Sequence, residues 1–283
     1  MTESKNKKSH YVRGISLIMT FFLTILILFL FLLVQLNLGL GSSQNLKNSI
    51  NDSNYTIGAY EEALAKSKAF VKERSLPEII VTKAVTEERF YMDSSRSIKA
   101  ALGGKSGRVD TTDLEAALRR NINRYFEDHR IIKSDDIRTA RKEIVQTVSG
   151  YYKSCAQFQF GTYFYPLNKK LGKVTPVAIP LLLILIGLTV AVLFRIQKFR
   201  HRGFRYLSYC LFSATVANLA IWLKLFVFDN VSGGIEADYY LEFCQAYLRS
   251  GIHITAAVTA AGAILFLVTF LFANRHKLAG KVN

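Results

Sequence analysis

The sequence predicts an all-α integral membrane protein with four transmembrane helices and a helical extracytoplasmic domain between the first and the second. Two observations lead to this fold class. Apolar residues gather in four runs, each long enough to cross a bilayer, although the overall composition of 50% hydrophobic and 20% charged residues is ordinary. In the polar interval of residues 41–173, apolar residues recur at three- and four-residue steps, which is typical of amphipathic helices.

The first apolar run, residues 15–40, is interpreted as transmembrane helix 1, an uncleaved signal anchor. It follows a basic N-terminal tail, residues 1–14, and a cleaved signal peptide would begin in the same way. The apolar region of a signal peptide is only about 7–15 residues long, however, and this run is much longer.

Three further runs are predicted as transmembrane helices 2, 3 and 4, and they cover residues 174–196, 206–228 and 252–273. Each has the length of about 20 residues that a helix needs to cross about 30 Å of hydrocarbon. Pro176 and Pro180 lie in the first turns of helix 2, where proline costs little because the early N–H groups have no partner within the helix. Helix 3 is the most polar, since it contains Asn218, Trp222 and Lys224.

Basic residues are concentrated in three short segments, which are the N-terminal tail (1–14), the loop of residues 197–205 and the C-terminal tail (274–283). The loop of residues 229–251, by contrast, has Arg249 as its one basic residue and several acidic residues. Short segments rich in lysine and arginine stay in the cytoplasm. The distribution therefore predicts a cell-membrane protein with both termini cytoplasmic, and with residues 41–173 and 229–251 on the outer side.

The net charge of +16 at pH 7 does not indicate a nucleic-acid partner. Most of the excess positive charge lies beside the spans, where basic residues fix the orientation and attract anionic lipid headgroups. The partner predicted from this feature is the lipid bilayer.

Within the outer interval, residues 41–54 are rich in glycine, serine and asparagine and are predicted to be a linker. Helical periodicity begins at Tyr55 and ends before Pro77, because the residue before a proline avoids helical dihedral angles. The β-branched run at residues 79–81 is left open between an extended crossing and a small strand. Further helices are predicted after Thr86, from a capping box at residues 112–115, and from the acidic start at residues 134–136.

Two local patterns in this interval have a structural and a functional interpretation. Residues 103–107, Gly-Gly-Lys-Ser-Gly, are interpreted as a turn, because a phosphate-binding loop would need a glycine in place of Lys99 and a preceding strand. The aromatic residues between 158 and 165 are interpreted as a membrane-interface belt, with a substrate-binding aromatic patch as the alternative.

No pattern predicts catalytic, cofactor-binding or metal-ligating residues. His129 follows Glu127 and Asp128, but three consecutive residues do not share one face of a helix. The spacings of zinc sites and of hydrolase nucleophiles do not occur either. The sequence therefore predicts no cofactor and favours a protein that is not an enzyme, although it does not decide that question.

The candidate site is a polar cluster predicted at the outer membrane face, and it consists of Lys224, Asp229, Arg249 and His253. An ionisable side chain within a span is costly and is a default candidate for function, so these residues suggest a ligand, proton or headgroup site. The alternative is favoured, namely that Lys224 extends its amine to the surface or forms a structural ion pair.

The fourth span has small residues four positions apart, and these are Ala256, Ala257, Ala260 and Ala261. Small residues at this spacing let helix backbones approach closely, so they are interpreted as the packing face of the bundle, with a homo-oligomer contact as the second interpretation. Cys155 and Cys244 are both predicted on the outer side near the membrane. A disulfide between them that ties the outer domain to the bundle is therefore left open.

These observations favour a multi-pass plasma-membrane protein whose outer helical domain mediates interaction, sensing or assembly with another membrane or envelope protein. The alternative is a transporter or channel component, because a polar third span can line a path in an oligomer. A membrane-embedded enzyme that acts on lipid or lipoprotein is the third hypothesis.

Overall fold

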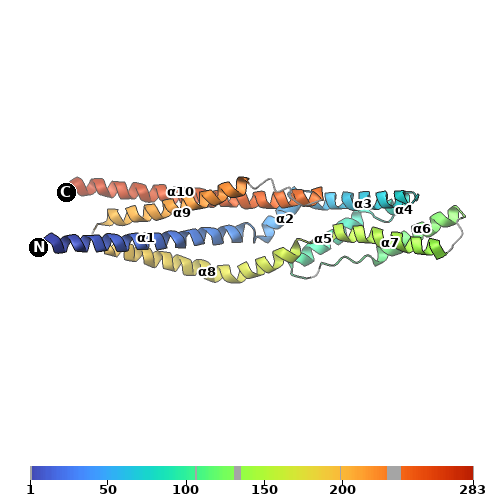
Figure 1. Ribbon diagram of the computed structural model, residues 1–283, viewed down its shortest axis with the longest axis horizontal. Helices are drawn as coiled ribbons and strands as arrows, with labels where there is room; N and C mark the ends of the chain where they lie inside the picture. The colour runs from blue at the N-terminus through green and yellow to red at the C-terminus, as the bar shows by residue number, and fades with distance from the viewer. Residues whose placement is uncertain (1, 106, 131–134, 198, 228–236, 283) are drawn as a thin grey trace. The chain divides into compact units, whose positions relative to one another are not determined.

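The structure is a computed structural model that describes residues 2–105, 107–130, 135–197, 199–227 and 237–282 (Figure 1). The chain forms two compact units. Unit 1 comprises residues 1–45, 168–231 and 247–283, and unit 2 comprises residues 46–167 and 232–246. Every regular element within the described ranges is a helix, which confirms the all-α prediction.

Four helices are long and apolar enough to cross a membrane, as the sequence predicts. They are α1 (Thr2–Leu38), α8 (Gly161–Ile196), α9 (Arg200–Val227) and α10 (Asp238–Val282). By length and composition they characterise a multi-pass membrane protein. The first residues of α8 and of α10 belong to unit 2, and the remainder of each helix belongs to unit 1.

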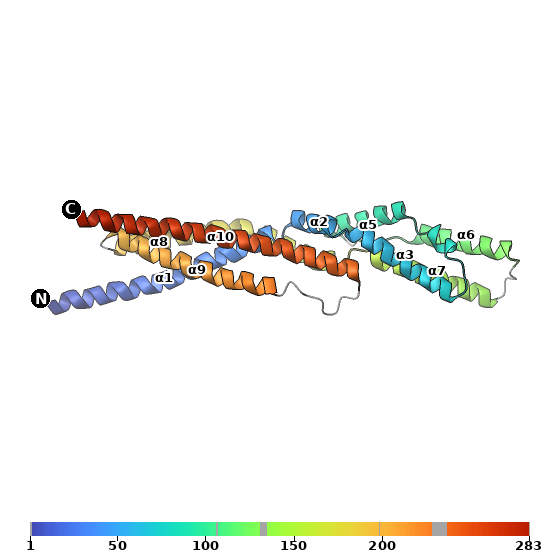
Figure 2. The same cartoon turned by 90° about the horizontal axis from the view of Figure 1, so that it is seen from above.

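Unit 1 is held together mainly by packing of α1 against α9 (Figure 2). Its buried apolar residues are Leu23, Ile27 and Phe31 of α1 and Cys210, Leu211 and Ala214 of α9. Large apolar side chains such as Phe21, Leu183 and Leu265 are exposed, as expected for the lipid-facing side of a membrane bundle.

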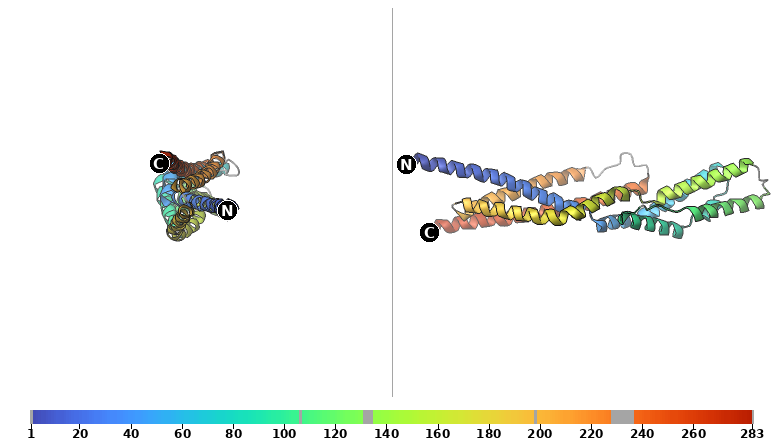
Figure 3. Two further views of the ribbon diagram at one scale, coloured as in Figure 1. Left: turned by 90° about the vertical axis from the view of Figure 1, so that its left-hand side faces the viewer. Right: turned by 90° about the horizontal axis from the view of Figure 1, so that it is seen from below.

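The helices of unit 1 alternate in direction. In Figures 1 and 3 the N-terminal end of α1, the junction between α8 and α9, and the C-terminal end of α10 lie at the same end of this unit. The three segments that the sequence analysis singles out as basic are therefore gathered at one end of the bundle.

Unit 2 is built from six shorter helices and the first residues of α8 and α10. The helices are α2 (Ser43–Asp52), α3 (Tyr55–Glu73), α4 (Ile79–Thr82), α5 (Glu87–Leu102), α6 (Thr112–Asp128) and α7 (Asp135–Ala156). Helix α7 packs against α3, α5 and α6. The apolar face predicted for α6 is buried in the core through Leu114, Leu118 and Ile122, and α7 contributes Ile144, Val145 and Val148.

Several elements of unit 2 differ from the sequence-based expectation. Part of the expected linker at 41–54 is helix α2, because Leu46 and Ile50 are one turn apart and both are buried. The run at 79–81 is the short helix α4, neither a strand nor an extended crossing, with Ile80 and Val81 in the core. Helix α10 begins at Asp238, inside the segment expected as a loop. Its first turns are ordered by packing, because they include Phe243, which is fully buried.

The N-cap residue of α6 is Thr111, one residue before the predicted box, and its side chain makes no capping hydrogen bond to the backbone. The Thr111 hydroxyl donates to a carboxylate oxygen of Glu115 (3.1 Å), and the Thr112 N–H donates to Oδ1 of Asp110 (3.0 Å). Hydrogen bonds from the Thr112 hydroxyl and N–H lower the pKa of the exposed Asp110 carboxyl below its ordinary value. The boundary of the helix is therefore fixed by an aspartate that the sequence pattern did not single out.

Candidate functional site

The predicted outer polar cluster stays a prediction, because one of its four residues is outside the part of the chain that the structure describes. Lys224, Arg249 and His253 are all exposed, and Asp229 lies outside the described residues.

Unit 1 instead contains a buried polar network that joins three spans. Nε2 of Gln35 on α1 donates to Oδ1 of Asn218 on α9 (2.8 Å). Nδ2 of the same Asn218 donates to Oγ1 of Thr259 on α10 (2.8 Å), and the Thr259 hydroxyl donates to the carbonyl of Thr255 (2.8 Å). Asn218 is fully buried. The carbonyl oxygen and the amino group of the Asn218 side chain both find partners only when α1, α9 and α10 are correctly placed.

Replacement of Asn218 by leucine is expected to destabilise unit 1 by about 1–2 kcal/mol, because it removes two hydrogen bonds between helices, each of which contributes about 0.6 kcal/mol on average in a membrane protein. The Gln35 amide would remain buried without its partner. Denaturation by dodecyl sulfate, followed through the fluorescence of Trp222, the chain's one tryptophan, measures the change.

The control for this prediction is Ser213→Leu, a polar-to-apolar change on an exposed position of the same helix. The Ser213→Leu change should leave the midpoint of denaturation by dodecyl sulfate unchanged. Adding Gln35→Leu to Asn218→Leu should recover part of the loss, because it removes the unpaired amide. An Asn218→Leu protein as stable as Ser213→Leu would contradict the role of the network.

The packing of α10 in unit 1 uses positions beside the expected alanine face. Ala257, Ala260 and Ala261 are exposed and Ala256 is half-buried. The contacts come from the neighbouring stripe of Thr255, Thr259 and Gly262. A Cβ at Gly262 would lie 2.6 Å from Oγ1 of Thr215 and 3.0 Å from the Phe31 ring, so glycine permits the close approach of α1, α9 and α10. The homo-oligomer contact through the alanines stays a prediction.

Cys155 and Cys244 are free cysteines in the structure, so the disulfide left open by the sequence is not formed. Both residues belong to unit 2, because residues 232–246 pack with residues 46–167. A bond between them would therefore not tie unit 2 to unit 1.

The aromatic residues of the expected interface belt contribute in part to the core of unit 2. Phe158 and Phe164 are buried, whereas Tyr163 is 76% exposed. The Phe158 ring packs edge-on against the buried Tyr55, with ring centroids 5.5 Å apart, and Tyr55 packs in turn against Phe243 at 5.4 Å. Burial raises the pKa of the Tyr55 hydroxyl above its ordinary value, so it stays neutral.

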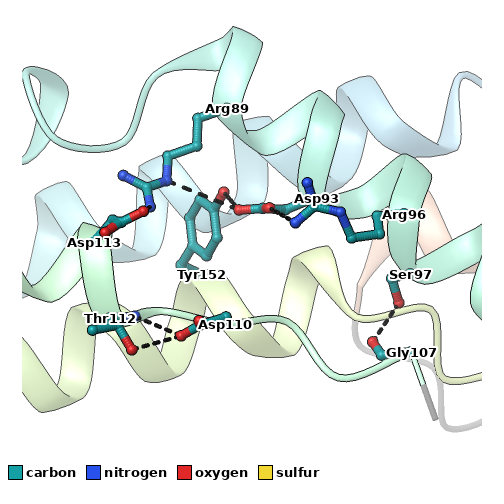
Figure 4. Close-up of polar contacts among 9 residues, drawn as sticks. All are labelled: Arg89, Asp93, Arg96, Ser97, Gly107, Asp110, Thr112, Asp113 and Tyr152. Atoms are coloured by element: carbon teal, nitrogen blue, oxygen red, sulfur yellow. Dashed lines mark hydrogen bonds and ion pairs between the residues drawn. The ribbon is translucent and has the colours of Figure 1, made fainter.

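A polar network centred on Asp93 joins α5 to α7 (Figure 4). The Tyr152 hydroxyl donates to Oδ2 of Asp93 (2.7 Å), and Arg89 lies 3.9 Å from the same oxygen. Arg89 also pairs with Asp113 at the start of α6 (3.4 Å), and Arg96 lies 3.6 Å from Oδ1 of Asp93. Each of these groups is paired within the domain, which indicates a structural rather than a catalytic role. Arg89, Asp93 and Arg96 are three and four residues apart on α5, whereas Tyr152 and Asp113 come from two other helices to which no local spacing connects them.

The glycine-rich stretch is a turn after the end of α5, as predicted, within the residues that the structure describes. Gly104 has a φ of +71°, in the left-handed region that favours glycine, and a Cβ there would overlap the Tyr165 ring. The segment is held by Ser97, whose hydroxyl donates to the carbonyl of Gly107 (2.8 Å; Figure 4). The same hydroxyl accepts from the N–H of Phe158 (2.9 Å).

No group of three or more histidine, cysteine, aspartate and glutamate side chains that could hold a metal ion occurs among the described residues. His129 caps the end of α6, and its Nδ1 lies 2.9 Å from the carbonyl of Tyr125. Its ring stacks near that of Tyr125, with centroids 4.1 Å apart. The histidine is therefore engaged with the helix from which it comes.

One feature of unit 2 that is suited to binding an anion is a basic groove of about 300 Å³ along α6 and α7. It is lined by Arg119 of α6 and by Arg138, Thr139, Arg141, Lys142 and Val145 of α7, and we call it the basic groove. Nη1 of Arg141 donates to Oδ1 of Asn123 on α6 (2.7 Å), which fixes this guanidinium. The buried Val145 provides an apolar floor. Sequence analysis missed this site, because its cations come from two helices and look like ordinary solvated helix faces.

Comparisons of the chain with protein-family models, with curated proteins and with solved structures find no match. The functional argument therefore depends on the geometry of the chain itself.

Proposed function

We propose that the chain is a plasma-membrane protein with both termini in the cytoplasm, and that unit 2 lies on the outer side as a non-enzymatic binding domain for a membrane or envelope component. The observation that carries the orientation is the gathering of the three basic segments at one end of unit 1 (Figure 3). Basic segments at one end of a bundle favour retention of that end in the cytoplasm. The chain leaves α1 at the other end of this helix to enter unit 2.

The binding role is supported by the construction of unit 2. This unit buries its own apolar core, so it can present a surface of fixed shape. Among the described residues, its basic groove is lined by cations, a threonine and a valine, and by no carboxylate, cysteine or histidine. Such a lining can attract and orient an anionic group, but it offers neither a strong nucleophile nor a general base near neutral pH.

A transport role receives less support from the bundle. Both ends of the Asn218 amide are bonded to side chains of neighbouring helices, which favours packing over a polar path. Flux measurements in liposomes with the wild type and with Lys224→Ala distinguish the two functions. Flux above background in the wild type that falls in the variant would replace the binding proposal.

The orientation is tested by labelling single cysteines in intact cells, in a background in which Cys155, Cys210 and Cys244 are serine. Gly150 on α7 is a suitable position, because it is exposed and nothing lies within 4 Å of a Cβ placed there. Arg205, exposed near the start of α9, is the matched position in a basic segment.

A membrane-impermeant maleimide is expected to label Gly150→Cys in intact cells, and to label Arg205→Cys only after permeabilisation. The reverse pattern would overturn the proposed orientation. Binding is then tested with a photo-crosslinking amino acid at Met92, which is 55% exposed on α5, and at Thr139 in the basic groove. Crosslinks to an envelope component from unit 2 support the proposal, and their absence at both positions contradicts it.

A further inference from the structure

We infer that the basic groove of unit 2 binds a phosphate group. The inference deepens the proposed function by naming the chemistry of the partner, and it depends on that proposal only for the side of the membrane on which the groove lies. The geometry, charge and size of the groove each contribute to the assignment.

The charge of the groove matches a phosphate dianion better than a single carboxylate. Four cations line it within the described ranges, and these are Arg119, Arg138, Arg141 and Lys142. Two of them have acidic neighbours, since Arg119 lies 3.9 Å from Glu115 and Arg138 lies 3.5 Å from Asp135. The four cations less these two carboxylates leave a formal charge of +2. The nearby Glu143 is paired with Arg74.

The donor set also favours phosphate. Three of the four cations are arginines, and a guanidinium presents a planar fork that matches two oxygens of a phosphate or a carboxylate. A phosphate has enough oxygens to accept from several forks and from the Thr139 hydroxyl at once, whereas a carboxylate has two. Arg141 is already oriented by Asn123, so less conformational freedom is lost when it binds.

The size of the groove limits the ligand to a small group. Its volume of about 300 Å³ is at the lower end of the range for ligand sites. This volume suits one phosphate with a short attached group. The same chemistry occurs in soluble phosphate compounds and in phospholipid headgroups, so the experiment separates these two sources.

The test uses the full chain in nanodiscs of phosphatidylcholine, in which both faces of the protein are accessible. Inorganic phosphate and pyrophosphate are titrated calorimetrically against sodium chloride at equal ionic strength. Vesicles of phosphatidylglycerol, with phosphatidylcholine vesicles as the reference, test a headgroup source by co-flotation. Poly-glutamate tests whether any polyanion suffices.

Arg141→Gln is the main variant, since it removes the charge and the fork of the guanidinium that Asn123 orients. Arg138→Gln is a second variant, and its side chain is 68% exposed, so its replacement should not impair folding. Arg108→Gln is the matched control, because Arg108 is exposed in unit 2 and does not line the groove. Arg141→Lys keeps the charge but loses the fork.

We expect Arg141→Gln to weaken binding of pyrophosphate by at least about tenfold, the loss typical of a hydrogen bond to a charged group, with Arg108→Gln near the wild type. Arg138→Gln should also weaken it, and Arg141→Lys should fall between the wild type and Arg141→Gln. Binding to phosphatidylglycerol vesicles that pyrophosphate displaces assigns the site to a headgroup phosphate. Pyrophosphate binding without vesicle binding assigns it to a soluble phosphate.

Equal weakening by Arg141→Gln and Arg108→Gln would overturn the inference, because it would indicate diffuse surface charge. Binding of poly-glutamate without binding of phosphate or pyrophosphate would overturn it as well, in favour of a carboxylate-bearing partner. These outcomes do not depend on orientation. If Gly150→Cys is labelled only after permeabilisation, the proposed function is rejected and the groove assignment is not. If Gly150→Cys is labelled in intact cells but the protein does not bind phosphate, the groove assignment alone is rejected.

Discussion

Replacement of Asp93 by alanine is expected to lower the free energy of unfolding of unit 2 by about 2–3 kcal/mol, the range for removal of hydrogen bonds to a charged group in a mostly buried setting. The Asp93 side chain is 13% exposed, and it accepts a hydrogen bond from Tyr152 while it neutralises Arg89 (Figure 4). Without it, the buried Tyr152 hydroxyl loses its acceptor. Arg89 keeps Asp113 and Arg96 is exposed, which limits the loss.

Hydrogen–deuterium exchange of peptides from α5 and α7 in the full chain measures this change without reference to unit 1. The double variant Asp93→Ala with Tyr152→Phe should lose less than the sum of the two single variants, because the hydrogen bond is counted in both. Strictly additive losses would show that the pair is not coupled.

Replacement of Gly161 by alanine is expected to destabilise unit 2 by about 1–3 kcal/mol, the cost of overpacking a filled interior. A Cβ at Gly161 would lie 2.2 Å from Cβ of Ala101 and 3.3 Å from its Cα. A Cβ cannot rotate away from such a contact, so the start of α8 and the end of α5 would have to move apart. The midpoint of thermal unfolding in detergent reports the loss.

Gly150→Ala is the matched control for this change. Gly150 lies in α7 with open space at its Cβ position, so alanine there should stabilise the helix by about 0.5–1 kcal/mol. Ala101→Gly should rescue Gly161→Ala by restoring the space. Shifts of the same sign for Gly161→Ala and Gly150→Ala would contradict the steric explanation.

Much of the fold could be predicted because its signals are local in the sequence. The four apolar runs give the spans, and the helical periodicity after residues 55, 86, 112 and 134 gives α3, α5, α6 and α7. The predictions failed where few residues carry the pattern. Helix α2 buries only Leu46, Ser49 and Ile50, and α4 has four residues, so neither produces a clear periodicity.

The candidate site could not be predicted in the same way. The sequence drew attention to Lys224 and His253 because an ionisable residue in a span is unusual, and the cluster expected from them stays a prediction. The basic groove needs Arg119 and Arg141 on two helices that are separated along the chain and packed together in space. A cation on a helix face looks the same in sequence whether it faces solvent alone or converges with others.

The sequence by itself determined that this chain is helical and has four helices long and apolar enough to cross a membrane, because hydrophobic length and periodicity are properties of consecutive residues. It also carried the charge asymmetry from which we infer orientation. Only the tertiary structure decided which polar residues meet. Gln35, Asn218 and Thr259 join three spans, and Asp93 joins Tyr152, across separations that no local pattern encodes. The physical reason is that a hydrogen bond or a charged groove depends on distances of a few ångströms, which packing of the apolar faces sets.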